Sequence, residues 1–218
     1  MIILGLSDLH GKIDAIDKLQ KQLKKADVVC LSGDITNFGG RAEVEKIMDR
    51  VGRHAPCILA VSGNCDFPEV DAWLDEKDIN LHAGVKAIDG IHFLGLGGSL
   101  ATPFNTPNEY NDSDFKGFLD QAKTGLEKDL PMVMVSHQPP VNTVCDRLSD
   151  GHHVGSPVIY QFIEQYQPLV CFTGHIHEAV GTDHIGKTHI INPGLLEKGH
   201  YAYAEIDTDR VVVEVRAY

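Results

Sequence analysis

The stretch IILGLSDLHG, residues 2–11, decides the fold class of this chain. Its first five letters are continuously apolar, which is typical of a strand buried on both faces of a sheet, and the letters SDLHG follow at once. The same pattern returns twice: the mostly apolar residues 27–31 precede the letters SGD, and the apolar residues 57–61 precede the letters SGNCD. Each stretch therefore predicts a buried strand that runs into a polar loop.

Segments with helical periodicity separate these strands. Apolar residues recur at helical spacing over residues 13–23 and again over residues 44–51. The order strand, helix, strand, helix, strand predicts a parallel sheet that is covered by helices. Ligands of open α/β sheets bind outside the carboxyl ends of the strands. The polar loops lie at those ends, so we expect the functional site there.

The rest of the chain supplies a second set of strands. Residues 85–96 are expected to form a hairpin around an Asp-Gly turn. Further strands are expected at residues 132–135 and 169–173, helices at 114–123 and 158–166, long loops at 97–113 and 141–155, and antiparallel tail strands at 180–185, 188–191, 201–206 and 211–216. The predicted fold class is α/β, a two-sheet mixed β-sandwich flanked by helices, in a single domain over residues 1–218.

The charge balance narrows the choice of partners. The chain has 31 acidic and 19 basic residues, a formal net charge of -12, and no run of Lys or Arg longer than Lys24-Lys25. Proteins that bind duplex nucleic acid tightly usually carry a basic stripe, so a nucleic acid partner is disfavoured. Bound divalent cations would reverse the sign of the charge locally, which keeps a small anionic substrate open.

Cysteine usage and hydropathy bear on the compartment. The five Cys residues are scattered and include no C-x-x-C pair, which argues against a disulfide framework and favours a reducing environment. There is neither a signal sequence nor an apolar stretch of the ~20 residues that a membrane helix needs. The expected location is therefore cytoplasmic, with no membrane partner.

Five predicted strand ends carry the side chains with most chemistry. They are, in chain order, Asp8 and His10 in D-x-H, Asp34 in G-D, Asn64 in G-N, a lone His137, and His175 and His177 in G-H-x-H. Carboxylates and imidazoles suit divalent Mn, Fe, Ni or Zn. Residues two apart in an extended segment point to the same side, so D-x-H and H-x-H can each direct two ligands into one pocket. The pattern predicts a metal site.

A pair of metal ions is the arrangement that we expect these ligands to hold. Two metal ions about 3.5–4 Å apart can clamp a phosphoryl group and lower the pKa of a shared water. Such a pair needs a bridging carboxylate, for which Asp34 is the natural candidate. We expect the first metal ion to be held by Asp8, His10 and His177, and the second by Asn64, His137 and His175.

The ordered set of motifs resembles the calcineurin-like metallophosphoesterases. The motifs span residues 8–177, and each one follows a predicted strand. The letters HQPP at residues 137–140 and NPG at residues 192–194 look most like the small single-domain bacterial and archaeal phosphoesterases of that superfamily. The resemblance implies the family's fold, a dinuclear site and the ligand roles given above.

Two departures from the common pattern qualify the resemblance. Many relatives read G-N-H-[DE], and that His is thought to protonate the leaving group; here Cys65 takes its place, in the sequence GNCD. A thiol donates a proton less readily than an imidazolium does. The G-D motif continues as residues 35–38, ITNF, rather than the Asp-Arg-Gly signature of the protein Ser/Thr phosphatases, which argues against that class.

The expected reaction is attack on phosphorus by a metal-bridging hydroxide. The two cations and Asn64 would stabilise the charge on the phosphoryl oxygens. Because position 65 lacks a His, protonation of the leaving group is expected to be weak or to come from Cys65, Asp66 or the loop pair His152-His153. Glu178 follows the H-x-H motif and could either support a ligand His or be a solvated charge.

The sequence is compatible with several functions. A phosphodiesterase acting on a small phosphoester substrate is the leading interpretation, and a phosphomonoesterase or nucleotidase is the alternative within the enzymes. A protein-binding scaffold without activity is the alternative from another class, because a retromer subunit of this fold lacks the catalytic His. All seven ligand positions hold competent residues here, which favours an enzyme. The tail strands could provide an edge for oligomerisation.

Overall fold

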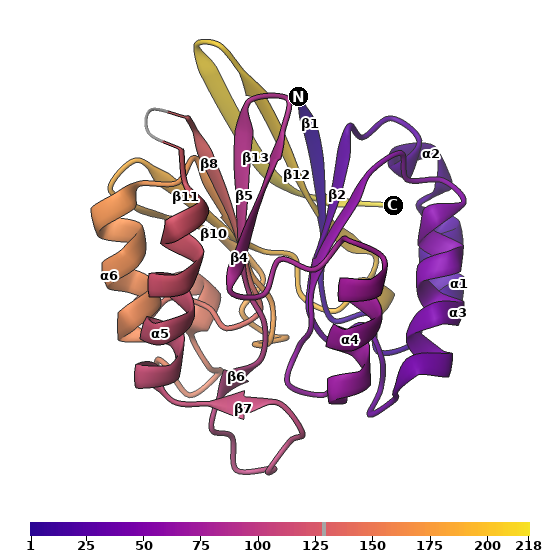
Figure 1. Ribbon diagram of the computed structural model, residues 1–218, viewed down its shortest axis with the longest axis horizontal. Helices are drawn as coiled ribbons and strands as arrows, with labels where there is room; N and C mark the ends of the chain where they lie inside the picture. The colour runs from indigo at the N-terminus through magenta and orange to yellow at the C-terminus, as the bar shows by residue number, and fades with distance from the viewer. Residues whose placement is uncertain (128–129) are drawn as a thin grey trace.

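Two mixed β-sheets packed face to face form the centre of the computed structural model, which describes residues 1–127 and 130–218. Helices cover the outer face of each sheet, α1 to α4 on one side and α5 and α6 on the other (Figure 1). The fold class predicted from the sequence, α/β with two sheets flanked by helices, is confirmed.

The first sheet combines the opening strands with the end of the chain. Its order is β13-β12-β1-β2-β3, with bounds β1 Ile2–Leu6, β2 Val28–Ser32, β3 Ile58–Val61, β12 His200–Asp207 and β13 Arg210–Ala217. Strands β1, β2 and β3 are parallel, and β12 joins β1 antiparallel, with Ile3 opposite Ala204. The carboxyl ends of β1, β2 and β3 therefore meet at one edge of this sheet.

The second sheet brings the later motifs to the same edge of the sandwich. Its order is β10-β11-β9-β8-β5-β4, with bounds β4 Gly84–Ile88, β5 Ile91–Leu96, β8 Met132–Ser136, β9 Val170–Phe172, β10 Gly181–Ile185 and β11 Thr188–Asn192. Strands β5, β8, β9 and β11 run parallel. A small third sheet pairs β6 (Ser99–Leu100) with β7 (Glu109–Tyr110).

Six α-helices flank the sheets in the described part of the chain. They are α1 Ile13–Lys18, α2 Gln20–Leu23, α3 Arg41–Gly52, α4 Pro68–Glu76, α5 Asp112–Ala122 and α6 Pro157–Tyr166. None of these helices combines the length and the apolar character that a membrane crossing needs.

The strands are apolar on both faces because each face of a sheet packs against a different core. In β1, Ile3 packs between the two sheets, whereas Leu4 and Leu6 pack against the helices of the first layer. In β9, Phe172 packs between the sheets and Cys171 packs against α5 and α6. Successive strand residues point to opposite faces, so each strand helps to build two separate cores.

Several local expectations change in the structure. The helix expected over residues 13–23 is divided at Leu19 into α1 and α2. Helix α4 was not expected, and the helix expected from residue 114 begins at Asp112 because the side chain of Asn111 caps its first turn. The loop expected over residues 97–113 contains β6 and β7. All five Cys residues are free in the structure.

The packing between the sheets generates a first prediction. Phe172 is fully buried there, so Phe172→Ala is expected to lower the free energy of unfolding by about 3–5 kcal/mol, through lost burial and a residual cavity. Urea unfolding followed by circular dichroism measures the change. Phe104→Ala is the matched control, since Phe104 is 80% exposed and its loss is expected to change the stability by less than about 0.5 kcal/mol. Equal effects of the two substitutions would contradict this description of the core.

Candidate metal centre

The loops that follow five parallel strands meet around a cavity of about 550 Å³ at one edge of the sandwich. Backbone hydrogen bonds join these loops: the amide of His10 donates to the carbonyl of Asp34 at 2.9 Å, and the amide of Gly174 donates to the carbonyl of His137 at 3.3 Å. Five of the seven predicted ligands line the cavity, namely His10, Asp34, Asn64, His175 and His177. Asp8 and His137 lie behind them and are buried.

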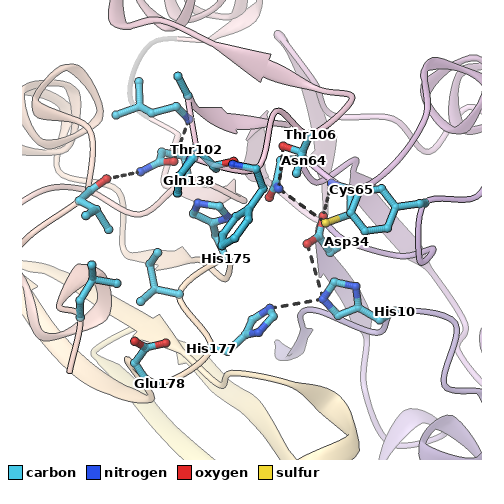
Figure 2. Close-up of a pocket in the computed structure, with 18 residues that line it drawn as sticks. His10, Asp34, Asn64, Cys65, Thr102, Thr106, Gln138, His175, His177 and Glu178 are labelled. Atoms are coloured by element: carbon cyan, nitrogen blue, oxygen red, sulfur yellow. Dashed lines mark hydrogen bonds and ion pairs between the residues drawn. The ribbon is translucent and has the colours of Figure 1, made fainter. Parts of the chain in front are cut away.

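The structure brings the residues of the first predicted ligand group close together. One ligand atom from each of Asp8, His10, Asp34 and His177 lies within 4.8 Å of all the others. Nε2 of His177 is 3.3 Å from Oδ1 of Asp8, and Nε2 of His10 is 3.6 Å from Oδ2 of Asp34. The side chains of His10, Asp34 and His177 point toward one another (Figure 2). Two carboxylates and two imidazoles that converge in this way match the donor set of a borderline divalent cation.

The second predicted ligand group lies on the other side of Asp34. Oδ1 of Asp34 is 3.5 Å from Nε2 of His137, while its other oxygen faces His10. The rings of His137 and His175 lie 5.1 Å apart, centroid to centroid. One oxygen of the Asp34 carboxylate thus faces a His of the first group, and the other faces a His of the second.

The hydrogen bonds around His137 provide a test of whether a cation fits. Nδ1 of His137 is 2.8 Å from the carbonyl oxygen of Ser32, which only accepts, so when the ring is neutral its proton lies on this nitrogen. Nε2 of His137 therefore presents a lone pair, and the atom that faces it at 2.8 Å is Oδ1 of Asn64.

The orientation of the Asn64 amide is fixed from its other end. Glu109 accepts a hydrogen bond from the hydroxyl of Thr106 at 2.6 Å, so that hydroxyl accepts from Nδ2 of Asn64 at 3.0 Å. Oδ1 of Asn64 must then face His137. Two acceptors at this distance repel each other unless positive charge lies beside them, and a divalent cation supplies it. The residues present fit a metal ion.

The backbone at the ligands is held in an uncommon conformation. Asp8, His10, Asp34 and His175 all have positive φ, at 52°, 43°, 48° and 69°. A residue other than Gly in this region carries a cost of order 1–3 kcal/mol, and such residues gather at functional sites. The structure therefore stores strain at four of the seven predicted ligands, which fixes the direction of their side chains.

Burial and neighbouring charges shift the pKa values of the ligands. Burial opposes the charge of Asp8, but the hydrogen bonds that it accepts from His177 and Ser7 and the charge of His177 act against it, so the pKa of Asp8 lies well below its ordinary value. Burial lowers the pKa of His175 to about 4. A carboxylate that stays ionised and an imidazole that stays neutral are the protonation states in which both side chains bind metal.

Asp66 lies in a different place from the one its predicted catalytic role requires. Its carboxylate is fully buried behind the cavity and accepts hydrogen bonds from the amides of Ile35, Thr36 and Gly63 and from the hydroxyl of Thr36. Burial and repulsion by Asp34 raise the pKa of Asp66 to about 7 against the effect of these bonds. Asp66 thus ties the loop after β2 to the loop after β3, which makes it a positioning residue.

Cys65 lines the cavity beside the two ligand groups. Its amide donates to Oδ1 of Asp34 at 2.8 Å, and its Sγ lies 3.6 Å from Nδ2 of Asn64. Burial and the negative charge of Asp34 raise the pKa of the Cys65 thiol. Cys65 therefore faces the cavity, and its environment makes it a weak acid.

The remaining predicted candidates divide between the cavity wall and the surface. Glu178 lines the cavity, and Figure 2 shows it apart from the cluster of His10, Asp34 and His177. The side chain of His152 is 79% exposed beside Asp150, and Nδ1 of His153 pairs with Asp146 at 2.7 Å. Neither His lines the cavity, so the structure does not support the role predicted for this pair.

Sequence reasoning missed the residues that support the ligands. Thr106 and Glu109 orient Asn64, and Ser7 donates to Oδ2 of Asp8 at 2.6 Å. Nδ2 of Asn192 donates to the carbonyl of Ile176 at 2.9 Å and so holds the H-x-H turn. The NPG letters and the unusual length of the loop over residues 97–113 mark the segments that hold some of these supporting residues. Neither feature indicates which ligand a supporting residue would contact.

The comparison with known families agrees with this geometry. The sequence model of the calcineurin-like phosphoesterase family matches residues 1–179. The chain belongs to this family. A phosphoesterase of this family is a hydrolase of phosphoesters that depends on divalent metal ions, and the cluster around Asp34 is its candidate site in this chain.

Individual relatives show how widely the fold is shared. An uncharacterized protein of Methanocaldococcus jannaschii is 39% identical over 207 residues, covering 93% of this chain and 91% of that protein. The crystal structure of TT1561 of Thermus thermophilus is similar with a TM-score of 0.75 and 20% identity, covering 98% and 97% of the two chains. A dimetal phosphatase from Danio rerio is similar with a TM-score of 0.66 and 12% identity, covering 100% and 96%.

The support of Asn64 by Thr106 generates a second prediction. Thr106→Val keeps the size of the side chain but removes the acceptor that fixes the amide, so it is expected to weaken binding of a second equivalent of Mn²⁺ about 10- to 100-fold. Calorimetric titration of metal-stripped protein with Mn²⁺ measures both equivalents. Thr106→Ser restores the hydroxyl and is expected to restore the affinity. Unchanged binding by Thr106→Val would show that the amide does not need this support.

Proposed function

We propose that the chain hydrolyses phosphodiesters at a dinuclear metal site. The observation that carries the proposal is the arrangement of acceptors around Asp34, with one ligand group on each of its carboxylate oxygens. Asp8, His10 and His177 would hold one ion, and Asn64, His137 and His175 the other, with Asp34 shared between them. Mn, Fe, Ni and Zn all suit these ligands.

Two features support the dinuclear form and the extent of the catalytic unit. The similar Danio rerio structure is described as a dimetal phosphatase. Strands β12 and β13 complete the sheet that carries Asp8 and Asp34, so the proposal takes residues 1–218 as one catalytic domain. Two divalent ions, when bound, polarise the phosphoryl oxygens and lower the pKa of a water molecule.

The residues of the chain have distinct tasks in this proposal. Asn64 keeps its amide carbonyl directed at the site because Thr106 holds its nitrogen. Asp66 holds the two loops that carry Asp34 and Asn64 at a fixed separation. The strained backbone of Asp8, His10 and Asp34 holds these ligands ready before substrate arrives, which reduces reorganisation during the reaction.

The shape of the cavity supports a diester over a monoester. The wall continues beyond the ligands along apolar residues such as Leu100, Leu148 and Ile176, which gives a second ester group a surface to contact. The cavity lining gives the phosphomonoesterase and scaffold alternatives no comparable support. The scaffold alternative also leaves unexplained why strain is stored at four predicted ligands.

Hydrolysis of bis(p-nitrophenyl) phosphate tests the proposal. Metal-stripped protein is expected to turn over this diester only after Mn²⁺ is added, with a higher kcat/KM than for p-nitrophenyl phosphate. Asp34→Asn is expected to lower kcat/KM about 100-fold or more, because the shared ligand loses its charge. Asp209→Asn is the matched control, since Asp209 is exposed in the turn between β12 and β13. Absence of turnover in protein with both ions bound would overturn the proposal.

The residue at position 65 generates a prediction about the leaving group. Because Cys65 is a weak acid, kcat/KM for a series of methyl aryl phosphates is expected to depend steeply on the pKa of the leaving phenol. Cys65→His supplies a better proton donor and is expected to make this dependence shallower, with the largest gain for the poorest leaving group. A flat dependence in the unmodified protein would show that another group already donates the proton efficiently.

A further inference from the structure

The cavity has an apolar side that the metal ligands do not explain. Next to the ligand groups it is lined by Leu100, Phe104, Leu148, Val154 and Ile176, and on the loop after β2 by Phe38. A cavity of about 550 Å³ with an apolar wall and a few polar groups is typical of a small-molecule site. A bare phosphate would leave most of this wall without a contact.

Phe38 is held at the cavity in a strained and exposed state. It has a φ of 55° and is 51% exposed. A bulky side chain at positive φ is a true outlier that strains the backbone. Because the Phe38 ring is half exposed, its burial does not offset this strain. The turn is fixed because the amide of Gly39 donates to Thr36 Oγ1 at 3.2 Å, and the same hydroxyl donates to the carboxylate of Asp66 at 2.7 Å. Contact between a ligand and the Phe38 ring would offset the cost of this conformation.

Phe104 is presented to the same cavity by a fixed loop. It is 80% exposed, yet the loop that carries it is tied at both ends, because Glu109 accepts hydrogen bonds from Thr102 and Thr106 at 2.6 Å each. Although partial burial opposes the charge, these bonds lower the pKa of Glu109 to about 2. The loop therefore stays tied at neutral pH, and Phe104 is available without a closing movement.

The charges at the cavity limit which substrates fit. Among the residues that the structure describes, its lining includes no Lys and no Arg, and its one ionisable residue beyond the candidate ligands and Cys65 is the acidic Glu178. Positive charge for the phosphate must then come from the metal ions. A second phosphate or a carboxylate on the substrate would face apolar groups and Glu178 without a partner, which carries a large desolvation cost.

We propose that this cavity selects monoanionic phosphodiesters with an uncharged aromatic ester group, which packs against Phe38 and Phe104. Aromatic rings gain from both burial and ring–ring contact, and neither gain requires charge. This inference rests on the proposed phosphodiesterase activity, and it adds the class of substrate.

Binding of phosphinates tests the inference separately from turnover. Diphenylphosphinate and dimethylphosphinate are monoanions whose P–C bonds a phosphoesterase does not cleave, and they differ only in the aromatic groups. Calorimetry on manganese-loaded protein is expected to show that the diphenyl compound binds at least about tenfold more tightly. Bis(4-carboxyphenyl)phosphinate, which keeps the rings and adds charge, is expected to bind at least about tenfold more weakly than the diphenyl compound.

Substitutions assign the difference to the two rings. Phe38→Ala and Phe104→Ala are each expected to reduce the preference for the diphenyl compound several-fold while leaving the affinity for dimethylphosphinate unchanged. Tyr166→Ala is the matched control, since Tyr166 is 38% exposed on α6 and lies outside this cavity. It is expected to keep the full preference.

The outcomes separate this inference from the activity on which it rests. Equal affinities for diphenylphosphinate and dimethylphosphinate, or a preference that survives both Phe substitutions, would overturn the inference even if bis(p-nitrophenyl) phosphate is hydrolysed. A preference that depends on Phe38 and Phe104 without hydrolysis of any diester would support the aromatic site and overturn the proposed activity.

Discussion

The geometry of the site depends on one contact, between Oδ1 of Asn64 and Nε2 of His137 at 2.8 Å. When the His137 ring is neutral both atoms are acceptors, and neither can turn away. The carbonyl of Ser32 fixes the proton of His137 on its far nitrogen, and Thr106 fixes the amide of Asn64. A cation that binds both atoms would remove the repulsion between their lone pairs. The buried carboxylates of Asp8 and Asp34 lie beside this contact, and their negative charge also favours a bound cation.

The sandwich makes this contact possible because its two halves come from different sheets. Asn64 follows β3 of the first sheet, whereas His137 follows β8 of the second. The site therefore exists only when the sheets are packed through the core around Phe172. A metal ion that binds ligands from both sheets would bind the folded state alone and so stabilise the packing, while the packing supplies the energy that holds strained residues such as Asp34 in place.

The sequence predicted the parts of the molecule that follow from local pattern. Apolar strands that end in polar loops predicted the sheets and brought all seven candidate ligands to one edge of the sandwich. The sequence did not show which sheet the tail strands join, because β10 joins the second sheet and β12 the first through pairing with strands far away in the chain. The supporting residues were missed for the same reason: Glu109 acts on Asn64 through Thr106 from a distant part of the chain, and no spacing rule connects them.

Asp66 and Cys65 are neighbours in the sequence, but their side chains point to different places. Cys65 lines the cavity, whereas Asp66 turns inward to bind the amides of Ile35 and Thr36. The inward position of Asp66 also affects the part of the cavity proposed to contact the substrate. Because Asp66 also holds Thr36, it fixes the turn that presents Phe38, so the loop that carries the shared ligand Asp34 also carries an aromatic wall of the cavity. The described lining of the cavity includes no Lys or Arg, so metal ions must bind the phosphate and the apolar wall must discriminate among its esters. The buried carboxylate of Asp66 holds the loop that carries both the ligand Asp34 and the wall residue Phe38, and so fixes the distance between them.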